Sequence, residues 1–217
     1  MAATRRQQGR QHGRRTASRV TRTAVATVAS AALVLGVSAC SEENTAGTDA
    51  GGGGGETFEF VSPGGQTEIT YDEADREKVG ELSGDSLMEP GTEISLDDYE
   101  GEVVVLNALG QWCGPCRSES DDLQAVQEKL EENGSGTVLG INVRDSVADK
   151  ARDFKTDNGL TYPSIYDPPF MSAMALGGLP ASVIPTTIVL DKEHRPAKVF
   201  LREIDENDLW DAVEPLL

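Results

Sequence analysis

Cysteine is scarce in this chain of 217 residues, which has three, at positions 40, 113 and 116. Three cysteines cannot form the disulfide scaffold of a small secreted domain, so each needs its own explanation. Histidine is rarer still, with two residues, and only His194 lies beyond the first forty positions. A zinc site built on the two neighbouring cysteines would need two further ligands. We therefore expect no metal.

Basic residues are also scarce once the first 39 positions are set aside. Those positions hold seven arginines and no acid, whereas the rest of the chain has 12 basic and 37 acidic residues, a net charge of −25. A surface this acidic repels phosphate backbones, so we expect no nucleic-acid partner. At 38% hydrophobic and 26% charged residues, the composition is that of a globular protein.

Residues 1–39 are predicted to be a signal peptide. Arginines precede a 17-residue run of small and apolar residues, the order found in secretory signals. The run ends at Val37-Ser38-Ala39-Cys40, which resembles the lipobox of bacterial lipoproteins, where the cysteine is lipidated and becomes the mature N-terminus. An incidental cysteine after an ordinary signal, or an uncleaved signal-anchor, are the alternatives. Residues 40–56, rich in glycine, then form a tether, and residues 57–217 form one domain.

The pattern of residues 57–217 predicts an α/β domain. Alternating apolar residues on either side of 62–65 predict an N-terminal β-hairpin, and the acidic segment 72–101 is expected to lie over the surface of the core. The β-branched run 103–106 is typical of a strand buried on both faces. Further elements are expected as helices around 123–133 and 147–158, strands at 137–143, 186–190 and 197–201, and a last helix with Asp205 as N-cap. This order predicts a central mixed sheet flanked by helices.

Two cysteines follow the first buried strand within ten residues, in Trp112-Cys113-Gly114-Pro115-Cys116. Cys113 is expected at a helix N-terminus, where free amides and the helix dipole stabilise a thiolate. Cys116, nearly one turn later, is close enough to resolve a mixed disulfide. The spacing therefore predicts a dithiol that exchanges disulfides. A purely structural disulfide is the alternative, although so short a loop stabilises little.

Around this motif the sequence resembles thioredoxins, and in particular the extracytoplasmic TlpA/ResA-like branch of the thioredoxin fold. The resemblance covers most of residues 83–217. It is carried by segment 94–101 with the strand that leads to Asn107, by the Trp-Cys-Gly-Pro-Cys motif, by a glutamate three residues after the second cysteine, and by Ile184-Pro185-Thr186-Thr187. The resemblance implies a thioredoxin fold for the domain.

The resemblance also implies roles for single residues. Ile184 and Pro185 would form a cis peptide bond that lies against the cysteines and binds substrate backbone. Trp112 would stand on the rim of the site, with packing alone as its alternative role. Glu119 lies about one helical turn beyond Cys116, so it would trade protons with a thiol if it is partly buried. Otherwise it is an exposed glutamate of an acidic helix.

A Gly-Pro pair between the cysteines is similar to that of reducing family members. We therefore expect a lipid-anchored thiol–disulfide oxidoreductase on the extracytoplasmic face of the membrane, a monomer with no cofactor beyond its dithiol. The resemblance favours the reduction of apocytochrome c during cytochrome c maturation, with a membrane electron donor that resets the pair. A general or copper-site disulfide reductase is the alternative.

Two other functions of the same fold remain alternatives. A thiol peroxidase would want a threonine before its reactive cysteine, and residues 107–112 contain none. A metal-binding lipoprotein would want more ligands near the cysteines than the single histidine His194.

Overall fold

The computed structural model describes residues 57–61 and 64–217, which belong to one compact unit. The predicted signal peptide, the tether and the lipidation site Cys40 lie outside the described residues. In the two described ranges, no helix is both long enough and apolar enough to cross a bilayer.

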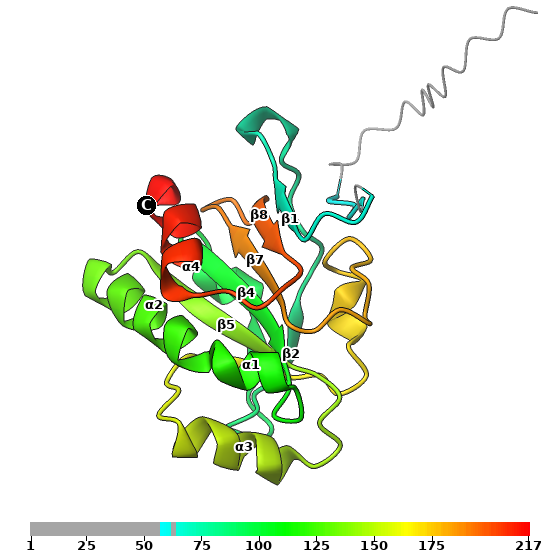
Figure 1. Cartoon of the computed structure of the whole chain (residues 1–217), viewed down its shortest axis with the longest axis vertical. Coiled ribbons are helices and arrows are strands. Elements are labelled where there is room, and N and C mark those ends of the chain that lie inside the picture. Colours follow the sequence, from blue (N-terminus) through cyan, green and yellow to red (C-terminus); the bar gives the residue numbers. More distant parts are fainter. Residues whose placement is uncertain (1–56, 62–63) are drawn as a thin grey trace, which may run out of the picture. The chain divides into compact units, whose positions relative to one another are not determined.

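A six-stranded mixed sheet forms the centre of the domain (Figure 1). Its strands, in spatial order, are β1 (Glu68–Thr70), β8 (Pro196–Phe200), β7 (Thr186–Leu190), β4 (Val103–Leu109), β5 (Gly136–Asn142) and β6 (Ser164–Tyr166). β4, β5 and β6 are parallel, whereas β7, β8 and β1 pair antiparallel with their neighbours. The predicted mixed α/β sheet is confirmed, with β6 as a strand that the sequence pattern did not indicate.

Helices α2 (Ser120–Asn133) and α4 (Glu206–Val213) lie side by side over one face of the sheet (Figure 1). The short helix α1 (Gly114–Ser118) precedes α2, and α3 (Ala148–Asp157) joins β5 to β6. Val103 and Val105 of β4 pack with the apolar residues of α2 and α4, while Val104 and Leu106 belong to a second core cluster. β4 is therefore buried on both faces, as its continuous apolar run predicts.

The N-terminus of α4 carries the predicted cap. The Asp205 carboxylate accepts a hydrogen bond from the Asp208 amide at 2.8 Å, and the Asp208 carboxylate accepts one from the Asp205 amide. Replacing Asp205 with alanine is expected to lower the free energy of unfolding by about 1 kcal/mol, because a free amide of the first turn loses its partner. Urea denaturation measures this loss. The exposed carboxylate of Asp211, within the same helix, is the control, and an equal loss in Asp211→Ala would contradict the capping role.

The predicted N-terminal β-hairpin is wrong. β1 pairs with β8, with Ile69 opposite Val199, while the Phe58 and Phe60 amides donate to the carbonyls of Lys78 and Gly177. Phe58 and Ile69, on either side of the predicted turn, are both buried. The alternating pattern therefore indicates correctly which side chains face the core. The pattern does not indicate which strand forms the backbone hydrogen bonds with this segment. In the structure, β1 pairs with β8.

The acidic segment 72–101 contributes more to the core than expected. It forms a separate two-stranded sheet from β2 (Ser83–Asp85) and β3 (Glu93–Ser95), and its three leucines, Leu82, Leu87 and Leu96, are all buried. Strands of three residues are too short to establish an alternating pattern, so the sequence did not indicate them.

Candidate active site

The cysteine pair lies just beyond the carboxyl end of β4, at the start of α1. Cys113 is the N-cap of α1, and its Sγ accepts a hydrogen bond from the Cys116 amide at 3.2 Å. The two sulfurs form a disulfide, with Cα atoms 5.3 Å apart. Cys113 is 4% exposed and Cys116 is fully buried. An incoming partner can therefore reach Cys113 first, and the amide of Cys116 is already placed to stabilise a thiolate on it.

The segment before β7 lies against the disulfide. The Ile184–Pro185 bond is cis, and the Ile184 carbonyl oxygen lies 3.8 Å from Cys113 Sγ. The side chain of Ile184 packs on the cysteines together with Leu109. The structure thus brings Ile184 and Pro185 to the position that the sequence resemblance implies, beside the sulfur that a partner meets first.

Glu119 is completely buried, where the sequence alone left its exposure open. Its two carboxylate oxygens accept hydrogen bonds from Asn107 Nδ2 at 2.9 Å and from the Ile204 amide at 3.2 Å. Loss of solvent raises the pKa of Glu119 to about 7, although both hydrogen bonds oppose the rise. Because residues i and i+3 of a helix are neighbours, this carboxyl lies on the side of the chain that carries Cys116. A group with such a pKa can take and return a proton near neutral pH.

Polar atoms in the core around Glu119 come from three different strands or loops. Asn107 on β4 also donates to Thr187 Oγ1 on β7 at 2.9 Å, so one amide links both strands to the carboxyl. Tyr162, just before β6, is buried, and its pKa is raised first by desolvation and then by the negative charge of Glu119. The sequence did not indicate Tyr162, because nothing in its neighbourhood along the chain marks it.

Trp112 stands at the edge of the site. It is 41% exposed, and its Nε1 donates to the Val143 carbonyl at 3.0 Å. Gly110 leaves the space for this contact, since a Cβ there would lie 2.3 Å from Trp112 Nε1 and 2.8 Å from the Val143 carbonyl oxygen. The ring is therefore partly packed and partly exposed, and whether it contacts a substrate stays a prediction.

His194 lies far from the cysteines in the fold. It is buried in the turn between β7 and β8, with Nε2 3.0 Å from the Tyr99 carbonyl oxygen, at the end of the sheet where β4 begins. In the part of the chain that the structure describes, no three His, Cys, Asp or Glu side chains gather in a way that would hold a metal ion.

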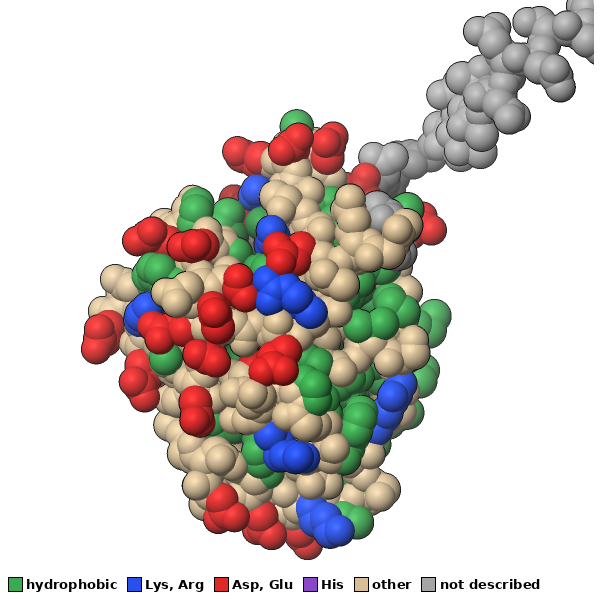
Figure 2. All heavy atoms as spheres, in the orientation of Figure 1, with side chains coloured by type: hydrophobic (Ala, Val, Ile, Leu, Met, Phe, Trp, Pro, Cys, Tyr) green, Lys and Arg blue, Asp and Glu red, His purple; other side chains and the backbone are tan. Residues whose placement is uncertain are grey.

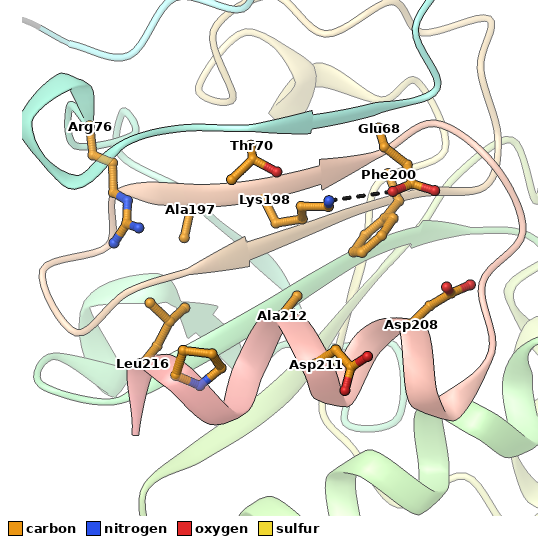
Figure 3. A pocket seen from close by; sticks show the side chains of 11 residues that line it. Glu68, Thr70, Arg76, Ala197, Lys198, Phe200, Asp208, Asp211, Ala212 and Leu216 are labelled. Atoms are coloured by element: carbon orange, nitrogen blue, oxygen red, sulfur yellow. Dashed lines mark ion pairs between the residues drawn. The ribbon is translucent and has the colours of Figure 1, made fainter.

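A cavity of about 410 Å³ between the β1–β8 edge and α4 is a second possible site (Figure 3). Phe200 and Ala212 form part of its lining, and the Lys198 ammonium lies 3.3 Å from Glu68. Arg202 also pairs with Glu68 and with Asp208. Glu68, Lys198 and Asp208 are thus engaged in ion pairs and no cysteine lines the cavity, so the disulfide region remains the better candidate.

Comparison with known proteins agrees with this geometry. The AhpC/TSA family matches residues 80–195, more than half of the chain. The structure is similar to a secreted thiol–disulfide isomerase from Corynebacterium glutamicum, with a TM-score of 0.73 and 66% identity over 75% of this chain and 98% of that one. It is also similar to a DsbF homologue from Corynebacterium diphtheriae, with a TM-score of 0.71 and 60% identity over 74% and 100% of the two chains.

A curated relative gives the chemistry in its name. The thiol–disulfide oxidoreductase ResA of Geobacillus thermodenitrificans is 28% identical over 64% of this chain and 78% of its own length. Other relatives named thiol–disulfide oxidoreductase ResA match at similar identity, among them that of Bacillus subtilis. With a thioredoxin fold, a disulfide between Cys113 and Cys116 and these relatives, the chain belongs to the AhpC/TSA family and is a thiol–disulfide oxidoreductase similar to ResA.

Proposed function

We propose that this protein is a reductase of protein disulfides that works outside the cytoplasm, held at the membrane by a lipid on Cys40. The observation that carries the exchange reaction is the asymmetry of the pair: Cys113 is slightly exposed at a helix N-terminus and Cys116 is fully buried. The reducing direction rests on the Gly-Pro pair between the cysteines, which is similar to that of reducing family members. The relatives named thiol–disulfide oxidoreductase ResA support disulfide exchange, and the Corynebacterium relative described as a secreted thiol–disulfide isomerase supports a location outside the cytoplasm. The favoured substrate is apocytochrome c, and a general or copper-site reductase is the second candidate.

The reaction needs only the two thiols and the substrate disulfide. The Cys113 thiolate attacks one substrate sulfur, which forms a mixed disulfide and releases the first substrate thiolate. The Cys116 thiolate then attacks Cys113 Sγ, which breaks the mixed disulfide, releases the second substrate thiolate and forms the Cys113–Cys116 disulfide. Two electrons pass to the substrate, and the two protons of the enzyme thiols end on the substrate thiols. A membrane dithiol donor then reduces the Cys113–Cys116 disulfide to two thiols by the same exchange and is itself oxidised to a disulfide.

Cys116 must lose its proton inside the core for the second step. Glu119 is a buried carboxyl three residues along the chain from Cys116, and a pKa of about 7 lets it accept that proton and return it when the pair is reduced again. Asn107 holds the carboxyl in place through one oxygen. In this proposal Glu119 accepts the proton of the buried Cys116 thiol, while the helix N-terminus stabilises the thiolate of Cys113.

Replacing Cys116 with alanine is expected to trap substrates on Cys113, because the resolving thiol is gone and the mixed disulfide persists. The full chain is expressed in its host, and proteins that a reductant releases are identified by mass spectrometry. Recovery of chains with Cys-x-x-Cys-His motifs supports the cytochrome c assignment, whereas a broad set of exported proteins supports the general reductase. The double variant Cys113→Ala, Cys116→Ala is the control. If it retains the same proteins, trapping on Cys113 is wrong.

A further inference from the structure

Two exposed cations near the disulfide have no acidic partner in this acidic domain, whereas half of the cations in the described residues do. Acidic side chains gather over α2 and α4, on the left of Figure 2. Several cations elsewhere pair with a carboxylate, namely Arg76, Lys129, Arg152, Arg195, Lys198 and Arg202. Arg144 and Lys150 make no ion pair with any residue that the structure describes. In a domain with so many acids, two neighbouring unpaired cations are available to a ligand.

Arg144 and Lys150 line one recess of about 190 Å³, and Trp112 forms another part of its wall. Val147, which is 47% exposed, contributes an apolar surface to the same recess. Trp112 precedes Cys113 directly, and consecutive Cα atoms lie about 3.8 Å apart, so the recess begins within one or two residues of the disulfide. A polypeptide whose sulfur is bonded to Cys113 therefore places a neighbouring side chain at this recess.

Three contacts hold Arg144 in place before any partner arrives. Its amide donates to the Pro168 carbonyl at 3.0 Å, its guanidinium donates to the Ala181 carbonyl, and its Cζ lies 5.8 Å from the centre of the Trp112 ring. Its backbone has φ of +57°, a conformation that costs free energy for a residue with a Cβ and persists where surrounding contacts hold it. The guanidinium keeps N–H donors beyond the one that bonds Ala181.

One acid also lines the recess, and its charge is partly engaged. Asp145 is 2% exposed, and its Oδ2 accepts hydrogen bonds from the Gln111 amide at 3.0 Å and from Asn142 Nδ2 at 2.7 Å. The two exposed cations outnumber this buried carboxylate. The recess therefore carries a net positive charge next to an exposed aromatic ring.

We propose that this recess is a substrate subsite that receives an acidic side chain close to the cysteine under attack, through Arg144 and Lys150. The proposal rests on the proposed disulfide reductase function and adds a preference that the cysteines themselves do not provide. An Asp or Glu carboxylate gains charge-assisted hydrogen bonds from the held guanidinium, and a Lys at the same position is repelled.

The test uses reduced protein and single-cysteine peptides joined as symmetric disulfide dimers. The peptides carry Glu, Gln or Lys at each of the two positions on either side of the cysteine, and peptide thiol release gives the second-order rate constant. At one or more positions, the Glu peptide is expected to react roughly fivefold faster than the Lys peptide at low salt. The preference is expected to shrink in 1 M salt, because these charges are exposed.

Variants assign the preference to the recess. Lys150→Gln is expected to reduce the Glu-to-Lys rate ratio, and Lys150→Glu to invert it, while Arg144→Gln tests the held guanidinium. Lys78→Gln removes an exposed cation from the far end of the sheet and is expected to keep the ratio. Equal rates for all peptides, or a ratio that Lys150→Glu leaves unchanged, would overturn the subsite and leave the reductase function standing. If the wild-type protein reduces no peptide at all, the proposed function itself fails.

Discussion

Replacing Cys113 with serine is expected to lower the rate of disulfide exchange by at least about a thousandfold, the scale on which loss of a nucleophile acts. Of the two cysteines, Cys113 is the one that is partly exposed, and its sulfur accepts a hydrogen bond from the Cys116 amide at the N-terminus of α1. A serine hydroxyl at that place stays protonated at neutral pH. Reduction of a model disulfide by the purified protein, with thiol release as the readout, measures the loss.

Two controls separate this effect from a general loss of structure or thiol content. Cys40→Ser removes the cysteine outside the described residues and is expected to leave exchange in solution at the wild-type rate. Hydrogen peroxide offered in place of the disulfide is expected to give no comparable turnover. If Cys113→Ser still exchanges disulfides, Cys113 is not the attacking sulfur. Turnover of peroxide at the same rate would instead favour the thiol peroxidase alternative.

Removing the buried carboxyl in Glu119→Gln is expected to change how stability depends on pH. An acid whose pKa rises from 4.5 to about 7 on folding binds more protons in the folded protein than in the unfolded chain. Stability is therefore lost as pH rises from about 4.5 to 7 and levels off above that, by up to about 1.4 kcal/mol per pH unit. Over this window the wild-type protein is expected to lose roughly 2–3 kcal/mol more than the variant.

Urea denaturation of the oxidised protein at several pH values measures both curves. The comparison uses slopes, because glutamine also changes the hydrogen bond to the Ile204 amide and shifts the whole curve. Asp121→Asn removes an exposed carboxyl in the first turn of α2, which follows the N-cap Glu119. It is the matched control and is expected to follow the wild-type slope. Parallel curves for wild type and Glu119→Gln would show that the carboxyl is ionised to the same extent before and after folding.

The sequence by itself determined the chemistry of this protein and the order of most of its elements. Two cysteines three residues apart, after a continuous apolar strand, place a thiol at a helix N-terminus by local geometry alone, and the structure has Cys113 there. Asp205 likewise caps α4 through contacts within four residues. Such features depend on neighbours along the chain, so patterns in the sequence report them.

Contacts between distant segments were decided only by the tertiary structure. Burial of Glu119 depends on Asn107, twelve residues earlier, and on the Ile204 amide, 85 residues later, so the sequence left its exposure open. The hairpin failed for the same reason, since β8 offers β1 an edge that lies more than 100 residues away in the chain. Arg144 beside Trp112 also carries no sequence signal. A periodic pattern reports which side chains turn inward, whereas the pairing of backbone edges and of buried charges depends on where the chain returns in space.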